Sequence, residues 1–312
     1  MQGAKEFLEE IKQELIERKN LGLIESVFFP LRFAKDRRLD YQHKKIAIED
    51  MPKDPRLCKD GQYANSIGTN VQNIVHAMAD LYRQEMQDDG LDPESLKNRK
   101  RGEKGAWLDI HDWLWNYKFK RWLEKNAWSI LKEKAKNSDN WLQFLTNEDM
   151  ASLKRGDRGL MMPPPPASVQ QTQPTIPINQ SLWMVIDLEL QPETNYQLLL
   201  LNRSQDGESL LCPSSAFAPN ALIDKPPILL PQKDSWAAQA ENPINFKFGK
   251  LETEEFLAIV LNQSLDLPWL TPRQEELLPE WTGERIKELF EKLEQQDNWQ
   301  VFYQSFDVVE RA

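Results

Sequence analysis

Cysteine is scarce in this chain of 312 residues, and long apolar runs are absent. The two cysteines, Cys58 and Cys212, lack the spacing of a metal or redox pair, which is typical of a protein that keeps its thiols reduced. No stretch reaches the roughly 18 uncharged apolar residues of a membrane helix, and the alternating charges of the N-terminus exclude a signal peptide. We therefore expect a cytoplasmic protein without a membrane partner.

Catalytic motifs are absent as well. The chain has no GxxxxGKS, GxxxxGKT or GxGxxG loop, so nucleotide hydrolysis is not expected. Residues 88–92 are acidic but lack the ligand alternation and the twelfth-position glutamate of a calcium loop. His111 lies between acids in residues 109–112, yet no second ligand set complements it, and a solvated helix face explains the motif better.

A thiol–imidazole dyad would require Cys58 to meet His43 or His76 in space, and the spacing carries almost no information on this. His76 falls on the polar side of a predicted helix, one turn before Asp80, where a local ion pair is the simpler role. We therefore assign no catalytic residue, no cofactor and no metal ligand. The sequence predicts that the chain is not an enzyme.

Charge divides the chain into two parts. Residues 1–160 carry 29 Lys and Arg against 27 Asp and Glu, a net charge of +2, whereas residues 161–312 carry 10 against 22, a net charge of −12. The acidic part would repel nucleic acid and anionic lipid. Between the two parts, residues 159–180 contain six prolines and no charge, which predicts an extended linker.

Before the linker, apolar residues recur at helical spacing. This spacing predicts helices over residues 7–15, 67–90 and 106–136 and a shorter helix around residues 141–145. For residues 27–64 the sequence does not decide between loops, short helices and a small hairpin. The first 158 residues are therefore expected to form a mainly helical domain.

After the linker the period changes. Alternation over residues 182–190 and the continuous apolar run over residues 196–201 predict strands, the second covered on both faces. Asp206-Gly207 predicts a hairpin turn, and residues 256–261 predict another buried strand. The predicted fold class is α+β. The expected domains are a helical domain (1–158), a proline-rich linker (159–180), a β-sandwich-like domain (181–270) and a helical tail (271–312).

The β-rich segment carries short motifs of a known family. They are residues 196–202, 206–208, 210–214, 254–260 and 265–267, with Phe217, Asn220 and Leu230-Pro231 between them. On these motifs, residues 181–270 resemble the bacterial domain of unknown function number 4384. The resemblance implies a β-rich accessory domain with a binding or regulatory role, attached to varied partners such as caspase-like peptidases and kinases. It implies no catalytic residue, and residues 1–158 show no peptidase or kinase signature.

The strongest functional signal is a basic, tryptophan-rich stretch. Residues 97–136 carry 12 Lys and Arg against five acids, a net charge of +7, and five tryptophans interleave with them. Cations and exposed aromatic rings suit a nucleic-acid groove, although tryptophans at helical spacing also suit a core, and the cations also suit a solvated or protein-docking face. The candidate binding residues are Lys97, Arg99, Lys100, Arg101, Lys104, Lys118, Arg121 and Lys125.

Two hypotheses from different classes follow. We favour a non-enzymatic adaptor or regulatory protein, in which the helical domain binds a partner protein and the β-rich domain binds another or senses a ligand. The alternative is a nucleic-acid-binding regulator that uses residues 97–136.

The alternative makes its own prediction. If residues 97–136 hold nucleic acid, replacing Lys100 and Arg101 with glutamate abolishes a salt-sensitive interaction, because phosphate contacts release counterions. Fluorescence anisotropy with labelled single- and double-stranded DNA and RNA at two salt concentrations measures this. An absence of binding at low salt, where electrostatic attraction is strongest, would contradict the alternative.

Overall fold

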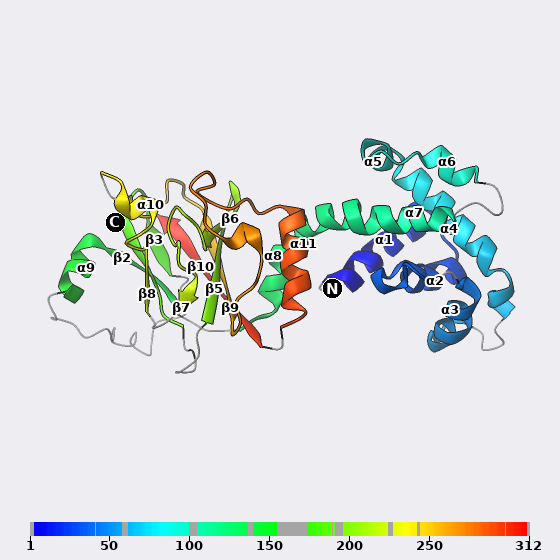
Figure 1. Ribbon diagram of the computed structural model, residues 1–312, viewed down its shortest axis with the longest axis horizontal. Coiled ribbons are helices and arrows are strands. Elements are labelled where there is room, and N and C mark those ends of the chain that lie inside the picture. Colours follow the sequence, from blue (N-terminus) through cyan, green and yellow to red (C-terminus); the bar gives the residue numbers. More distant parts are fainter. Residues whose placement is uncertain are drawn as a thin grey trace. The chain divides into compact units, whose positions relative to one another are not determined.

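The computed structural model describes residues 3–40, 42–57, 62–99, 105–136, 140–154, 174–188, 190, 196–223, 227–241, 244–296 and 298–310. The chain forms two compact units, Met1–Ala127 and Trp128–Ala312, which we call the helical unit and the β unit (Figure 1). The predicted domain boundary at residue 158 is therefore wrong. Residues beyond Trp128 that lie before the proline-rich segment contribute strands to the sheets of the β unit.

Short helices dominate the helical unit. None of the described helices has the length and apolarity that a membrane crossing requires. The α-helices are α1 (Ala4–Lys19), α2 (Leu23–Phe33), α3 (His43–Asp50), α4 (Ile67–Leu81), α5 (Arg83–Asp88), α6 (Pro93–Lys97), α7 (Ala106–Trp113) and α8 (Phe119–Glu133), which continues into the β unit. Shorter turns of helix are η1 (Lys35–Arg37), η2 (Met51–Lys53), η3 (Gln62–Asn65) and the π-helix η4 (Leu114–Lys118).

Local signals explain where these helices begin and end. Asn20 ends α1 in the left-handed conformation, with φ of 50°. The Asp92 carboxylate accepts a hydrogen bond from the N–H of Glu94 and caps α6, with Pro93 at the first helical position. The helix predicted from residue 67 to about 90 is interrupted at Tyr82, which leaves the helical conformation with φ of −108° and separates α4 from α5.

Aromatic residues from distant segments fill the core of the helical unit. The ring of Phe7 on α1 lies 5.6 Å from that of Trp115 and 5.1 Å from that of Phe119. Phe28 and Phe33 on α2 are fully buried. The stretch that the sequence left open, residues 27–64, thus contains short helices, and α2 supplies a large share of this core.

The β unit is built from two sheets. The larger one has the strand order β1-β10-β9-β5-β6, with β3 also paired to β10 and β7 to β5, and the smaller one has the order β2-β4-β8. The strands are β1 (Ala135–Lys136), β2 (Leu142–Thr146), β3 (Thr175–Pro177), β4 (Leu182–Ile186), β5 (Tyr196–Ser204), β6 (Gly207–Cys212), β7 (Leu222–Ile223), β8 (Ile228–Leu230), β9 (Thr253–Leu261) and β10 (Trp299–Val309). Helices α9 (Asn147–Lys154), α10 (Trp236–Gln239) and α11 (Gly283–Leu293) and the turn η5 (Pro268–Leu270) complete it.

Several strand predictions are confirmed. Residues of β5 are buried on both faces from Tyr196 to Leu201, as the continuous apolar run predicted. The Asp206-Gly207 turn joins β5 to β6, and Gly207 has φ of +121°, a conformation that side chains with a Cβ rarely adopt. The two sheets enclose one apolar core, to which Met184 of the smaller sheet and Phe256 of the larger both contribute. The α+β fold class is confirmed.

Two secondary-structure predictions are wrong. The helix expected around residues 141–145 is strand β2, which pairs with β4. The expected helical tail, 271–312, contains α11 but ends in β10, the longest strand, which pairs antiparallel with β9. In β10, Phe302, Phe306 and Val308 alternate with more exposed residues and enter the common core, a two-residue period that overrides the helical trend of the preceding segment.

Phe256 on β9 tests this assignment. Its ring lies near Phe144 on β2 and Phe306 on β10, with centroid distances of 5.7 and 5.8 Å, and it is fully buried. We expect Phe256→Ala to lower the free energy of unfolding of the β unit by about 3–5 kcal/mol, because it leaves a cavity between the two sheets. Urea denaturation measures the loss. Leu222→Ala on β7 is the control, because Leu222 is 49% exposed, and a small effect of Phe256→Ala would contradict the two-sheet core.

Candidate functional site

Acidic partners neutralise most described members of the predicted basic set. Lys97 pairs with Asp80 and Arg99 with Asp109. The Lys118 ammonium lies 2.8 Å from a carboxylate oxygen of Glu85. Lys100, Arg101 and Lys104 lie outside the described residues.

Arg121 pairs with both carboxylate oxygens of Asp89. Its guanidinium donates two hydrogen bonds to the Asp89 carboxylate, at 2.8 and 2.7 Å, and the Trp113 indole N–H donates a third at 2.7 Å. The hydrogen bonds from Arg121 lower the pKa of Asp89, and that from Trp113 acts in the same direction. Lys125 differs from Arg121, because it is exposed and no ion pair of the described residues includes it.

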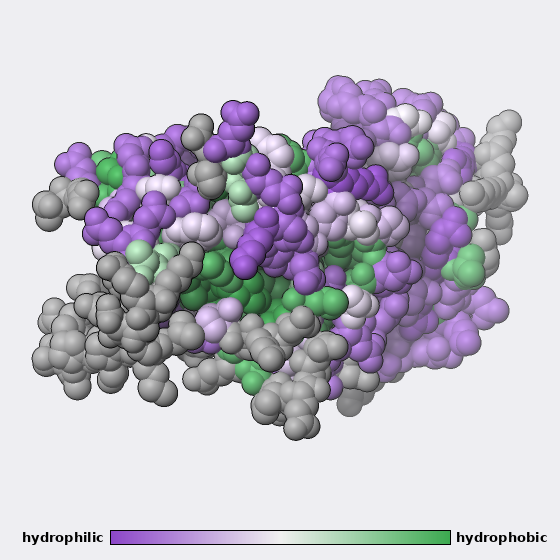
Figure 2. All heavy atoms as spheres, turned by 60° about the vertical axis from the view of Figure 1, so that its left-hand side comes forward, coloured by the Kyte–Doolittle hydropathy of each residue, from purple (hydrophilic) through white to green (hydrophobic). Residues whose placement is uncertain are grey.

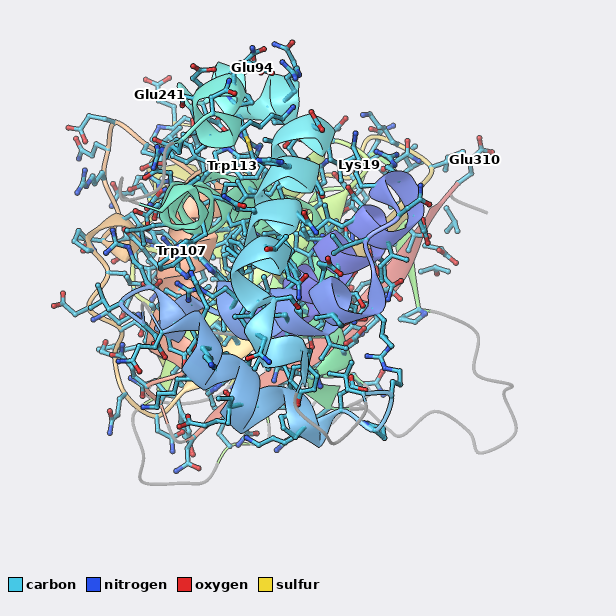
Figure 3. The ribbon with its side chains drawn as sticks, turned by 90° about the vertical axis from the view of Figure 1, so that its right-hand side faces the viewer. Lys19, Glu94, Trp107, Trp113, Glu241 and Glu310 are labelled. Atoms are coloured by element: carbon cyan, nitrogen blue, oxygen red, sulfur yellow. The ribbon has the colours of Figure 1, made fainter. Side chains whose placement is uncertain are left out.

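The tryptophans of the basic stretch belong to cores. Figure 3 shows Trp107 and Trp113 among the helices of the helical unit. The exposed fractions of Trp107, Trp113, Trp115, Trp122 and Trp128 are 6%, 2%, 3%, 8% and 2%. A ring that stacks on a base must offer its face to solvent, so these five do not supply a stacking platform in this conformation.

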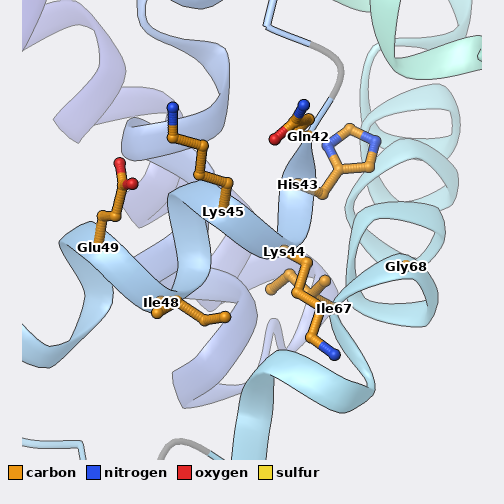
Figure 4. A pocket seen from close by; sticks show the side chains of 8 residues that line it. All are labelled: Gln42, His43, Lys44, Lys45, Ile48, Glu49, Ile67 and Gly68. Carbon is orange, nitrogen blue, oxygen red and sulfur yellow. The ribbon is translucent and has the colours of Figure 1, made fainter.

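Hydrophilic side chains dominate the helical unit on the face drawn in Figure 2. A hollow of about 710 Å³ nevertheless opens between α3 and the start of α4. Figure 4 shows Ile48 on α3 pointing toward Ile67 on α4. We call this feature the α3–α4 hollow. Its lining residues are Gln42, His43, Lys44, Lys45, Ile48, Glu49, Ile67 and Gly68.

Two cations at the hollow have no acidic partner among the described residues. Lys44 and Lys45 are exposed, and no ion pair of the described residues includes either of them. Glu49 is the acidic residue of the lining. Ile48 is 55% exposed, so the hollow also presents apolar surface to solvent.

A buried aromatic and basic cluster supports the first turn of α3. The Arg32 guanidinium is fully buried and lies 3.3 Å from the centroid of the Trp107 ring. The His43 imidazole meets the same indole edge-on at a centroid distance of 5.3 Å. Burial, assisted by the nearby charge of Arg32, lowers the pKa of His43 to about 4. His43 is therefore neutral near pH 7 and adds no positive charge to the hollow.

The motif around His111 is not a solvated helix face, because its side chains bond to other groups of the helical unit. His111 is 1% exposed, and its Nε2 lies 2.9 Å from the Ala34 carbonyl oxygen. Asp109 pairs with Arg99, and the Asp112 carboxylate accepts two hydrogen bonds from Arg38, at 2.6 and 2.8 Å. Among the described residues, no group of three or more His, Cys, Asp and Glu converges on a metal position.

The two cysteines give no reactive pair in the described part of the chain. Cys58 lies outside the described residues, so the dyad with His43 or His76 has no geometry here. His76 is exposed on α4, on the polar side, as predicted. Burial raises the pKa of the Cys212 thiol to about 12, which makes its thiolate scarce at neutral pH.

Three exposed apolar residues of the β unit lie on or next to residues that backbone hydrogen bonds join. Ala216 donates its N–H to Leu277 and accepts one from Ala237, at 2.9 and 3.0 Å, and Ile244 donates to Ala237 at 2.9 Å. Trp236 directly precedes Ala237. The exposed fractions of Trp236, Ile244 and Leu277 are 50%, 43% and 38%. We call these three side chains the Trp236 cluster.

Comparisons with protein families, curated proteins and solved structures found no match to this chain.

Sequence reasoning missed both apolar surfaces. The α3–α4 hollow falls in the stretch whose structure the sequence left open, where the adjacent Lys44 and Lys45 beside Ile48 were the available signal. The Trp236 cluster is assembled by backbone pairing between segments that are distant in sequence, and its residues follow no regular period.

The partly buried His43 predicts a pH dependence of stability. Unfolded His43 takes up a proton as the pH falls through about 6.5, whereas folded His43 does so only near pH 4. The unfolded state therefore binds more protons in this window, and we expect stability to fall, on the order of 2 kcal/mol for His43, as the pH drops from 6.5 to 4. Denaturation curves at several pH values measure this. His43→Gln should flatten the profile, and the exposed His76→Gln should leave it unchanged.

Proposed function

We propose that this chain is a non-enzymatic adaptor whose helical unit and β unit each bind a partner protein. The observation that supports the proposal most is that each unit has an exposed large apolar side chain in a distinct setting: Ile48 lines the α3–α4 hollow, and Trp236 belongs to the Trp236 cluster. Contiguous apolar surface on a folded unit is typical of docking sites. Aromatic side chains such as that of Trp236 are also enriched where proteins bind one another.

The resemblance of residues 181–270 to an accessory binding domain supports a binding role for the β unit. We propose that the β unit contains such a domain. The buried, unpaired thiol of Cys212 is in keeping with a reducing compartment, so we place the adaptor in the cytoplasm.

Nucleic-acid binding by residues 97–136 has weaker support. Lys97, Arg99, Lys118 and Arg121 already face acidic partners within the helical unit. Phosphate groups would have to displace these carboxylates, which reduces the gain from each contact. The buried tryptophans supply no base-stacking surface in this conformation.

Affinity purification of the tagged full chain tests the proposal. Quantitative mass spectrometry of proteins captured from source cells compares the unchanged chain with Ile48→Ser and Trp236→Ser. We expect two sets of partners, one lost by each variant, because each substitution removes an exposed apolar contact from one unit.

Matched controls are Tyr117→Ser in the helical unit and Leu251→Ser in the β unit, whose side chains are 46% and 56% exposed. They should retain both sets of partners. Capture that is unaffected by Ile48→Ser and Trp236→Ser, or that disappears on nuclease treatment, would contradict the adaptor role.

A further inference from the structure

The α3–α4 hollow combines uncompensated positive charge with apolar surface, and this combination selects among partners. Lys44 and Lys45 lie on successive positions of α3, and Ile48 follows Lys44 by one helical turn. The chain as a whole carries a net charge of −10. At the hollow, two unpaired cations thus lie within one helical turn of the exposed side chain of Ile48.

We propose that the α3–α4 hollow binds an acidic peptide segment of a partner protein, with an apolar side chain placed between Ile48 and Ile67 and carboxylates beside Lys44 and Lys45. The inference rests on the proposed adaptor function and names the chemistry of the partner of the helical unit.

The charge of the hollow favours an acidic ligand. The cations of the predicted basic set that face acids, such as Lys118 and Arg121, have their charge compensated within the helical unit. Lys44 and Lys45 belong to no ion pair of the described residues, and Glu49 is the opposing charge of the lining. An incoming carboxylate thus gains attraction at the hollow without displacing an internal partner.

The shape of the hollow favours a peptide with an apolar side chain. Ile48 is 55% exposed and can contact a ligand from the solvent side, whereas Ile67 is 4% exposed and forms part of the packed surface of the hollow. Gly68 adds no side chain, and a Cβ built there meets no atom within 4 Å, so a peptide backbone has room to approach α4. A volume of about 710 Å³ holds more than a single small anion.

The lining disfavours a polyanion such as nucleic acid. Two lysines neutralise few phosphates, and affinity for a nucleic acid grows with the number of phosphates contacted. His43, the aromatic member of the lining, packs its ring edge-on against Trp107. An acidic peptide needs only one or two charge contacts and an apolar anchor, which matches what Lys44, Lys45 and Ile48 offer.

A ligand-unbiased selection tests the inference. A library of random 12-residue peptides displayed on phage is selected on the full chain, and the enriched peptides are synthesised and measured by fluorescence anisotropy. We expect enrichment of Asp and Glu around an apolar residue. Because the chain carries a net charge of −10, non-specific attraction would enrich basic peptides instead.

Charge reversal locates the binding. We expect Lys44→Glu with Lys45→Glu to weaken the selected peptides about tenfold or more, because two attractions become repulsions. The control, Lys5→Glu with Lys125→Glu, changes the net charge equally at two exposed lysines outside the hollow and should change affinity less than about twofold. Ile48→Ser should weaken binding without changing the charge. Circular dichroism establishes that each variant is folded.

Peptides without an acidic bias, or equal loss in the hollow variant and its control, would overturn the inference. If partner capture depends on Ile48 but the selected peptides are not acidic, the adaptor function is supported and the proposal of an acidic peptide ligand is rejected. If acidic peptides bind at the hollow but the full chain captures no partner that Ile48→Ser loses, the site stands and the adaptor function fails.

Discussion

Internal charge pairing decides which surface of the helical unit is available to a partner. This unit, Met1–Ala127, carries 23 Lys and Arg against 22 Asp and Glu, so its positive and negative charges nearly balance in number. Arg121 is held by two hydrogen bonds to Asp89 and Lys118 by Glu85, and both acids come from the segment that follows α4. Most described cations of the basic stretch are thereby paired within their own unit, Lys125 excepted, whereas Lys44 and Lys45 on α3 are adjacent and both lack an ion pair among the described residues.

The sequence could not reveal this division. Counting charges within residues 97–136 finds a net charge of +7, because the compensating acids, among them Asp80, Glu85 and Asp89, precede that window. Helical spacing did indicate that Trp115 and Trp122 could enter a core, and they do. Periodicity does not identify the residue that a side chain meets across space, and for Arg121 only the structure shows the contacts with Glu85 and Asp89.

In the β unit, short-range patterns were informative and long-range pairing was not. The apolar run of β5 and the Asp206-Gly207 turn were readable because both depend on neighbouring residues. β2 and β10 were misread because the sequence does not show which strands lie beside them, and pairing with β4 and β9 decided the outcome. The Trp236 cluster likewise depends on backbone contacts of Ala216 with Ala237 and Leu277, which are distant from it in sequence.

The central claim is that the helical unit meets a protein through α3, rather than nucleic acid through the basic stretch. Site-specific photo-crosslinking tests it most directly, with a photoreactive residue placed in the full chain at position 48 in one protein and at position 125 in another. Both positions are exposed, so each reports what approaches it. We expect crosslinks to protein from position 48 and no specific crosslink from position 125. Nucleic acid joined to position 125, with none of the crosslinks from position 48 to protein, would contradict it.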